Sequence, residues 1–225
     1  MIDHELLSAV MQGDSTKVKE LVAQKPESVN FICEESGKSL FEIALEAGYS
    51  NIATTLLKSE EFDLNLPAHN PLRITIALGY IELAKELLNL GANPNYRPEQ
   101  ISSSLLLCLE NEYFDLAQLM VDKGAEVDIR NNKGWTPLIW TSIKGRKLAV
   151  DFLIKNGANI NICNNDGWNA ITGAYFKNRK DIVNILSKEG AVFSARFSEA
   201  ALLSSYQSMA LLWFKRFPSY IKSQI

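Results

Sequence analysis

The chain has 225 residues, of which 47% are hydrophobic and 22% are charged, and this composition is typical of a globular protein with a sizeable core. Its net charge of −3, with no long basic run, argues against nucleic-acid binding through phosphate neutralisation. No run of about eighteen apolar residues is present, so no membrane span is predicted.

Pairs of helices are predicted to follow one another along the chain. In each pair the second helix carries apolar residues three and four apart, as at Ile81, Ala84 and Leu88, which places them on one helix face. The first helix is shorter, and the clearest examples are predicted at residues 72–78, 104–110, 137–144 and 170–177. Two more helices are predicted at 198–205 and 208–217, where Pro218 ends the second.

Two sets of residues recur at a fixed interval and define a repeat. Four Gly-Ala pairs follow one another at one constant spacing, beginning at Gly91, Gly124, Gly157 and Gly190. Twelve residues before each pair comes a position that ends the first helix, and the same position can be traced upstream. These positions are Gly13, Gly48, Gly79, Glu112, Gly145 and Asn178. A period of about 33 residues predicts one structural unit stacked on copies of itself. Stacked repeats form a long binding surface, and nothing in the period itself makes a catalytic site.

The stretch from Asn131 to Leu138 reads Asn-Asn-Lys-Gly-Trp-Thr-Pro-Leu. It resembles the Gly-x-Thr-Pro-Leu turn of the ankyrin repeat, which opens two antiparallel helices. Gly134 permits a backbone angle that a side chain would resist, Thr136 can cap the helix, and Pro137 fits its first turn. The resemblance implies an all-α ankyrin-repeat solenoid of about six helix-turn-helix units, with short β-hairpin loops and a helical C-terminal cap.

The resemblance covers nearly the whole chain. Six repeats are predicted within residues 1–192, the first as an N-terminal capping repeat: 1–33, 34–66, 67–97, 98–130, 131–163 and 164–192. Residues 193–225 are predicted to cover the apolar face of the last repeat as a cap. The alternatives are that its aromatic residues contact a partner, or that Trp213, Phe214 and Phe217 pair two copies of an otherwise monomeric chain.

No catalytic or metal-binding pattern stands out, so the sequence predicts neither an enzyme nor a cofactor. His4 and His69 both lie near repeat turns, where a local structural role is expected. Gly37-Lys38-Ser39 ends like a phosphate-binding loop but lacks the earlier glycine that such a loop needs.

The cysteines and the beginning of the chain indicate a reducing, cytoplasmic compartment. Cys33, Cys108 and Cys163 are far apart, odd in number and without zinc-ligand spacing. Cys108 occupies a helix position expected to be a small buried hydrophobe. The acidic residues 1–5 lack the basic start and apolar run of a signal peptide.

The ankyrin resemblance implies a non-catalytic protein–protein interaction module, whose partner meets the loop tips and the exposed face of the first helices. Leu78, Ile143 and Phe176 are expected to face solvent there, whereas Trp140 is expected in the core. For Trp135 and Trp168 the structural alternative is packing on a neighbouring hairpin. The candidate partner-binding residues are Lys133, Trp135, Ile143, Lys144, Asp166, Trp168, Phe176 and Lys177.

Charge is unevenly distributed along the repeats. Acidic residues gather in the second repeat, at Glu34, Glu35, Glu46, Glu60 and Glu61. Basic residues gather in the fifth and sixth, at Lys144, Arg146, Lys147, Lys177, Arg179 and Lys180. Such a surface is expected to steer and orient a partner, although the basic runs could equally be solvated helix connections.

The resemblance extends to the degenerate ankyrin chains of intracellular bacteria, several of which are delivered into host cells. It therefore raises the hypothesis of a secreted effector that binds a host protein. Two other classes of function stay open: a self-assembling protein that pairs through its C-terminal helices, and a small-ligand-binding protein or enzyme with a site in the divergent ends.

Overall fold

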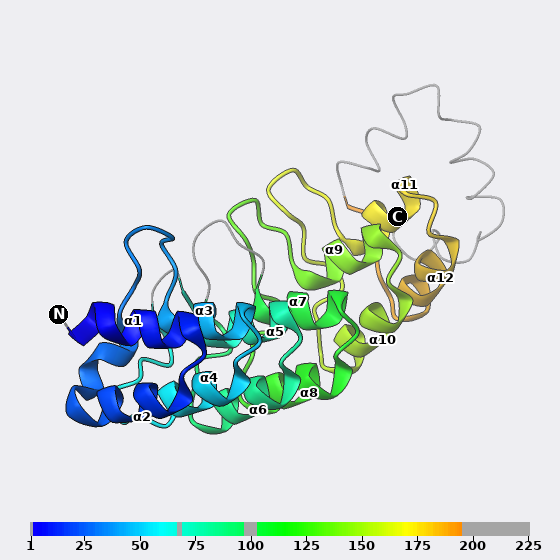
Figure 1. Cartoon of the computed structure of the whole chain (residues 1–225). Coiled ribbons are helices and arrows are strands. Elements are labelled where there is room, and N and C mark those ends of the chain that lie inside the picture. The colour runs from blue at the N-terminus through cyan, green and yellow to red at the C-terminus, as the bar shows by residue number, and fades with distance from the viewer. Residues whose placement is uncertain (1, 67–68, 97–102, 195–225) are drawn as a thin grey trace, which may run out of the picture. The chain divides into compact units, whose positions relative to one another are not determined.

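The computed structural model describes residues 2–66, 69–96 and 103–194 (Figure 1). In these ranges the chain forms twelve α-helices, one 3-10 turn and a single isolated β-bridge, between Ile32 and Ser39. The predicted C-terminal helices at 198–205 and 208–217, and almost all of the predicted cap, lie outside the described residues.

The chain divides into two compact units, with the division between Ile129 and Arg130. Unit 1 contains α1 (Ile2–Gln12), α2 (Ser15–Gln24), the 3-10 turn η1 (Pro26–Asn30), α3 (Leu40–Glu46), α4 (Ser50–Leu57), α5 (Pro71–Leu78), α6 (Ile81–Asn89), α7 (Ser104–Glu110) and α8 (Phe114–Asp122). Unit 2 contains α9 (Pro137–Lys144), α10 (Lys147–Lys155), α11 (Ala170–Phe176) and α12 (Lys180–Lys188). The four first helices predicted from sequence are therefore present within one residue of their predicted bounds.

Within each unit, antiparallel helix pairs stack side by side. In unit 1 the first helices α1, α3, α5 and α7 form one layer and the second helices α2, α4, α6 and α8 form the other (Figure 1). In unit 2, α9 packs on α11 and α10 packs on α12. The apolar residues predicted on the second helices face this stack, since Ala84, Leu87 and Leu88 of α6 are almost completely buried.

A polar side chain caps the N-terminus of most of the first helices. Ser39, Asn70, Ser103, Thr136 and Asn169 each accept a hydrogen bond from the backbone N–H three residues later. Each bond satisfies one of the donors that a helix start leaves unpaired. The predicted cap at Thr136 is confirmed, and Pro137 occupies the first turn of α9 as predicted.

Left-handed backbone conformations end the helices at the predicted positions. Gly13, Gly48, Gly79 and Gly145 have φ between 73° and 81°. Glu112 and Asn178 hold the same place with φ of 63° and 56°, although a side chain makes that conformation costly. The second set, Gly91, Gly124, Gly157 and Gly190, also has positive φ. Both markers of the repeat are therefore confirmed as helix-ending positions.

Asparagine side chains join the loop after one second helix to the loop after the next. Asn95 accepts a hydrogen bond from the backbone N–H of Glu126 at 2.8 Å and donates one to the carbonyl of Gly124 at 2.8 Å. Corresponding bonds run from the backbone N–H groups of Asp63, Asn93 and Val192 to the side-chain oxygens of Asn30, Asn65 and Asn161. Each bond connects two neighbouring repeats of the same unit.

Candidate functional site

Unit 2 presents two loop tips of the same geometry, one repeat apart. In the first, the backbone N–H of Asn131 donates to the carbonyl of Trp135 and its side-chain oxygen accepts from the N–H groups of Lys133 and Trp135. In the second, Asn164 makes the same contacts with Asp166 and Trp168. These five-residue turns close on themselves, so the loops predicted as β-hairpins form no strands among the described residues.

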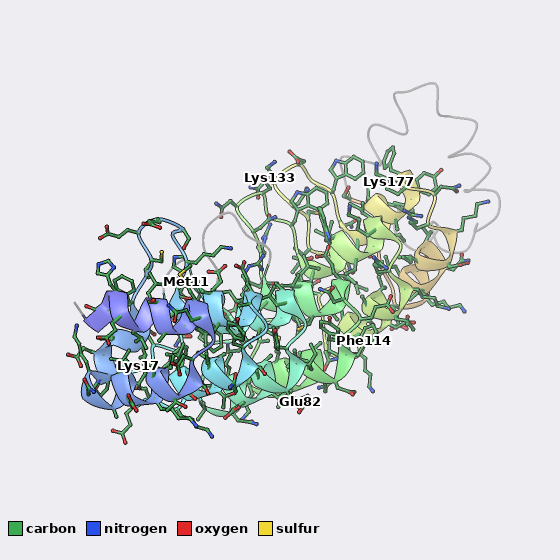
Figure 2. All side chains as sticks on the ribbon, in the orientation of Figure 1. Met11, Lys17, Glu82, Phe114, Lys133 and Lys177 are labelled. Carbon is green, nitrogen blue, oxygen red and sulfur yellow. The ribbon has the colours of Figure 1, made fainter. Side chains whose placement is uncertain are left out.

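The two tips are bonded to each other. The backbone N–H of Asn165 donates to the carbonyl of Lys133 at 3.0 Å, and its side-chain amide donates to the carbonyl of Asn132 at 3.0 Å. Gly134 is required at this point, because a Cβ there would lie 2.5 Å from the side-chain oxygen of Asn165. The exposed side chains of Lys133 and Asp166 are therefore carried on braced loops, and Figure 2 shows Lys133 at its tip.

Two tryptophans and a lysine cluster in the fifth repeat. The rings of Trp135 and Trp140 meet edge to face, with 6.2 Å between centroids, and the ammonium of Lys144 lies 4.8 Å from the centroid of the Trp140 ring. The prediction that Trp140 lies in the core is wrong, since its side chain is only half-buried. The indole is larger than the leucine usual at this place, and it extends from α9 toward Trp135 and Lys144.

The corresponding cluster of the sixth repeat is more exposed. The ring centroids of Trp168 and Phe176 are 4.8 Å apart, and the ring of Tyr175 contacts those of Phe176 and Phe193 edge to face. Phe176 is 50% exposed although it is a large apolar side chain, which confirms the expectation that it faces solvent. An exposed phenylalanine supported by a second ring is typical of an anchor in a protein interface.

Ile143 differs from its expected position. Its side chain is half-buried, because it fills the space where Gly173 of α11 lacks a side chain, and a Cβ on Gly173 would lie 2.6 Å from Ile143 Cγ1. The expectation that Ile143 faces solvent like Phe176 is therefore wrong. Ile143 lies against the neighbouring helix α11, and only part of its side chain is exposed to solvent.

The other candidate residues are exposed or half-exposed. Trp135 and Trp168 are half-buried, while Lys144 and Lys177 are exposed at the ends of α9 and α11. Figure 2 shows Lys177 on the surface at the end of α11. The structure adds Trp140 to the predicted set. We call the following residues the aromatic–basic surface: Lys133, Trp135, Trp140, Lys144, Asp166, Trp168, Phe176 and Lys177. The pairing of an aromatic with a lysine four residues later, at Trp140 and Lys144, was the sequence signal for the missed residue.

The corresponding positions of unit 1 have a different chemistry. Met11 holds the place of Phe176 and is 62% exposed, and Leu78, 43% exposed, holds the place of Lys177, which confirms that Leu78 faces solvent. Lys38 follows the turn glycine where unit 2 has tryptophan, and its ammonium donates to the Glu46 carboxylate at 2.6 Å. This hydrogen bond raises the pKa of Lys38. An ion pair thus replaces the aromatic cluster.

The two units also differ in net charge. Residues 1–129 contain nine Lys and Arg against 21 Asp and Glu, a net charge of −12. Residues 130–194 contain ten Lys and Arg against four Asp and Glu, a net charge of +6. The uneven distribution predicted from a few residues therefore extends over whole units.

The described residues contain no arrangement suited to metal binding: no group of three or more His, Cys, Asp or Glu side chains is placed to hold an ion. Cys108 is completely buried in α7, as predicted, and burial raises the pKa of its thiol to about 12. The ring nitrogen Nδ1 of His69 lies 3.3 Å from a carboxylate oxygen of Glu42. Across the same ranges, every helix is too short or too polar to cross a membrane.

Comparisons with known proteins agree on one family. The family model described as ankyrin repeats, three copies, matches residues 6–98 and again residues 105–196. Among curated proteins, mouse ankyrin repeat domain-containing protein 17 is 35% identical over 69 residues, which is 30% of this chain and 3% of that protein. Human ankyrin repeat domain-containing protein 63 is 25% identical over 132 residues, 54% of this chain and 34% of that protein. The match thus spans about a third or less of each of these relatives.

Three solved structures share the fold. An ankyrin repeat domain of Acinetobacter baumannii matches 84% of this chain and 99% of its own, with a TM-score of 0.73 and 24% identity. The ankyrin repeat protein EF0377 matches 81% and 96%, with a TM-score of 0.70 and 28% identity. A chain of the complex between the predatory endopeptidase Bd0816 of Bdellovibrio bacteriovorus and the immunity protein Bd3460 matches 81% and 96%, with a TM-score of 0.67 and 27% identity.

Proposed function

Because the chain belongs to the ankyrin-repeat family, whose fold serves protein–protein interaction, we propose that it acts by binding a protein partner on the aromatic–basic surface of unit 2. The observation that carries this proposal is the half-exposed ring of Phe176, held at 4.8 Å from Trp168. A few side chains carry most of the binding energy of a protein interface, and aromatic residues, phenylalanine included, are enriched in interfaces.

The surface is built to bind without large rearrangement. The tips at Lys133 and Asp166 are joined by hydrogen bonds from Asn165, and the tryptophan backbones close both turns. A surface that is already ordered loses little conformational entropy on association. The exposed cations around it would act mainly on the rate and orientation of encounter.

The test compares two surfaces at matched positions. The variant Trp168→Ala/Phe176→Ala removes the anchors of unit 2, and Met11→Ala/Leu78→Ala removes exposed apolar side chains at corresponding positions of unit 1. Both are checked for folding by circular dichroism and used as bait beside the wild type, with retained proteins identified by mass spectrometry. We expect a partner that wild type and the unit 1 variant retain and the unit 2 variant loses.

Other outcomes would redirect the proposal. A partner lost only by the Met11→Ala/Leu78→Ala variant would place the interface on unit 1. Turnover of a small molecule by the folded chain, with no protein retained, would favour the ligand-binding or enzymatic alternative. The hypothesis of a bacterial effector in a host cell rests on the family resemblance and stays a prediction, as does pairing through residues 193–225.

A further inference from the structure

Two clusters of cations recur in unit 2 with the repeat period. Residues 144–147 read Lys-Gly-Arg-Lys and residues 177–180 read Lys-Asn-Arg-Lys, so that three cations recur in the same order one repeat later. Each cluster spans the end of a first helix and the start of a second one, at the α9–α10 and α11–α12 connections. All six side chains are exposed: Lys144, Arg146, Lys147, Lys177, Arg179 and Lys180.

The contacts within the two clusters leave much of this charge facing solvent. The guanidinium of Arg179 donates from Nε to the carbonyl of Ile143 at 3.2 Å, and Lys144 lies over the Trp140 ring. Within the described part of the chain, no carboxylate forms a salt bridge with Lys147, Lys177 or Lys180. These three lysines therefore present unneutralised positive charge at the helix connections of unit 2, and Lys177 directly follows the exposed Phe176.

The spacing of the clusters is set by helix packing. Helices α9 and α11 are in direct contact, and packed helices lie about 8–10 Å apart. In a polyproline II segment, residues i and i+3 lie on the same face, about 9 Å apart, because this helix has three residues per turn and rises about 3.1 Å per residue. A β-strand matches less well, since residues on one face of it are about 7 Å or 13 Å apart.

We infer that the partner of the aromatic–basic surface is an acidic protein segment in the polyproline II conformation, with Asp or Glu at every third position and apolar residues between them. One carboxylate meets the cluster at 144–147 and the next meets the cluster at 177–180. The intervening apolar side chains contact Phe176 and the neighbouring indoles. This inference rests on the proposed function and specifies the partner that it left unnamed.

A protein segment fits the charges of the whole chain better than a nucleic acid or an anionic membrane does. Asp166 and Asp181 stand exposed among the cations of unit 2, and residues 1–129 carry a net charge of −12. A long polyanion or an extended anionic surface is repelled by that charge, whereas a short acidic segment need meet only unit 2. The aromatic rings of this surface also favour a partner that has apolar side chains to cover them.

Three synthetic peptides test the inference on the full chain. The first has the sequence Glu-Pro-Leu repeated four times. The second peptide has the same composition, but its four glutamates form two pairs, and the two glutamates of a pair are two residues apart. The third peptide is the first one with every glutamate replaced by lysine. Because three of the four tryptophans, Trp135, Trp140 and Trp168, lie on the surface, their fluorescence reports binding of these tryptophan-free peptides directly.

We expect the first peptide to bind most tightly, with an affinity that falls as salt is raised. Lys144→Glu/Lys177→Glu should weaken it about tenfold or more, since both clusters lose attraction and gain repulsion. The matched control is Lys155→Glu/Lys188→Glu, which makes the same charge change at exposed lysines that also lie one repeat apart, at the ends of α10 and α12. The control should bind nearly as the wild type does.

Equal binding of the first two peptides would overturn the inferred spacing, and binding of the lysine peptide would overturn the inferred charge. An equal loss of affinity in the Lys155→Glu/Lys188→Glu variant would mean that binding depends only on net charge. That result would overturn the role of the two clusters. Preferred binding of an oligonucleotide would assign the clusters to nucleic acid. If no peptide binds while Trp168→Ala/Phe176→Ala still loses a partner, this inference fails and the proposed function stands.

Discussion

The hydroxyl of Tyr80 donates a 2.8 Å hydrogen bond to the carbonyl oxygen of Leu45, one repeat earlier in unit 1. Leu45 lies in the last turn of α3, where helix carbonyls lack partners within the helix. The residue after a left-handed position reaches back at other places too: the Tyr49 ring covers Gly13, and Arg179 donates to the carbonyl of Ile143. These three side chains each fasten a repeat to the one before it.

Removal of the Tyr80 hydroxyl should weaken this connection. Tyr80→Phe removes this bond and leaves the Leu45 carbonyl with only its backbone donor, the N–H of Gly48 at 3.0 Å. The expected cost is about 1 kcal/mol or less in the free energy of unfolding. Urea denaturation followed by circular dichroism measures the change. In the control, Tyr49→Phe, the contact with Gly13 is made by the ring, so a comparable loss there would contradict a specific role for the Tyr80 bond.

Gly173→Ala should destabilise unit 2 although alanine favours helices. The new Cβ would lie 2.6 Å from Ile143 Cγ1, and overpacking costs about 1–3 kcal/mol, more than the gain of about 1 kcal/mol in helix propensity. In the double variant Ile143→Ala/Gly173→Ala the conflict is absent, so its free energy of unfolding should exceed the additive expectation by about 1 kcal/mol. Additive effects in thermal or urea unfolding would show that the two residues do not compete for space.

Glu112→Gly should stabilise the protein. Glu112 has φ of 63°, a conformation that costs a residue with a side chain about 1–2 kcal/mol and costs glycine little. Part of that gain is lost to the greater freedom of glycine in the unfolded chain, so we expect about 0.5–1 kcal/mol by urea denaturation. Asn178→Gly should gain less, because asparagine tolerates this conformation better. A lower stability of Glu112→Gly would contradict the assigned strain.

The Asp3 carboxylate should make stability depend on pH at the acidic end. It accepts hydrogen bonds from the Ser28 hydroxyl at 2.6 Å and from the Lys25 ammonium at 2.9 and 3.0 Å. The Ser28 bond, and then the contact with Lys25, lower the pKa of Asp3 below its ordinary value of 3.8. A carboxyl whose pKa is lower in the folded state stabilises the fold above the unfolded pKa, and that contribution is lost as the pH falls through the folded pKa.

Asp3→Asn should therefore lower the melting temperature near pH 7 and lose this effect below about pH 4. Melting curves of both proteins between pH 2.5 and pH 7, roughly the range over which an aspartate titrates, would show the difference closing as the pH falls. Ser28→Ala removes the first hydrogen bond and should reproduce part of the change. A difference that stays constant over the whole range would mean that Asp3 acts through packing and not through its charge.

The repeat period was enough to locate most of the helices and their ends. Spacing identified the end of every first helix, including those at Glu112 and Asn178, where no glycine marks it, but not the ends of the second helices α2 and α4. It could not establish which side chains of α9 face solvent, because that depends on the next repeat. Gly173 occupies the place in the sixth repeat that Trp140 holds in the fifth, and the space it leaves is filled by Ile143. A pattern within one repeat contains no information about a missing side chain in its neighbour.

The asparagine bonds between loops make the contact between two repeats depend on the chemistry of a single amide. The amide nitrogen of Asn95 donates to the carbonyl of Gly124 while its oxygen accepts from the N–H of Glu126. Deamidation to aspartate would keep the acceptor, remove the donor and set a negative charge against the Gly124 oxygen. One spontaneous reaction would thus turn an attraction between two neighbouring repeats into a repulsion, without any change in the gene.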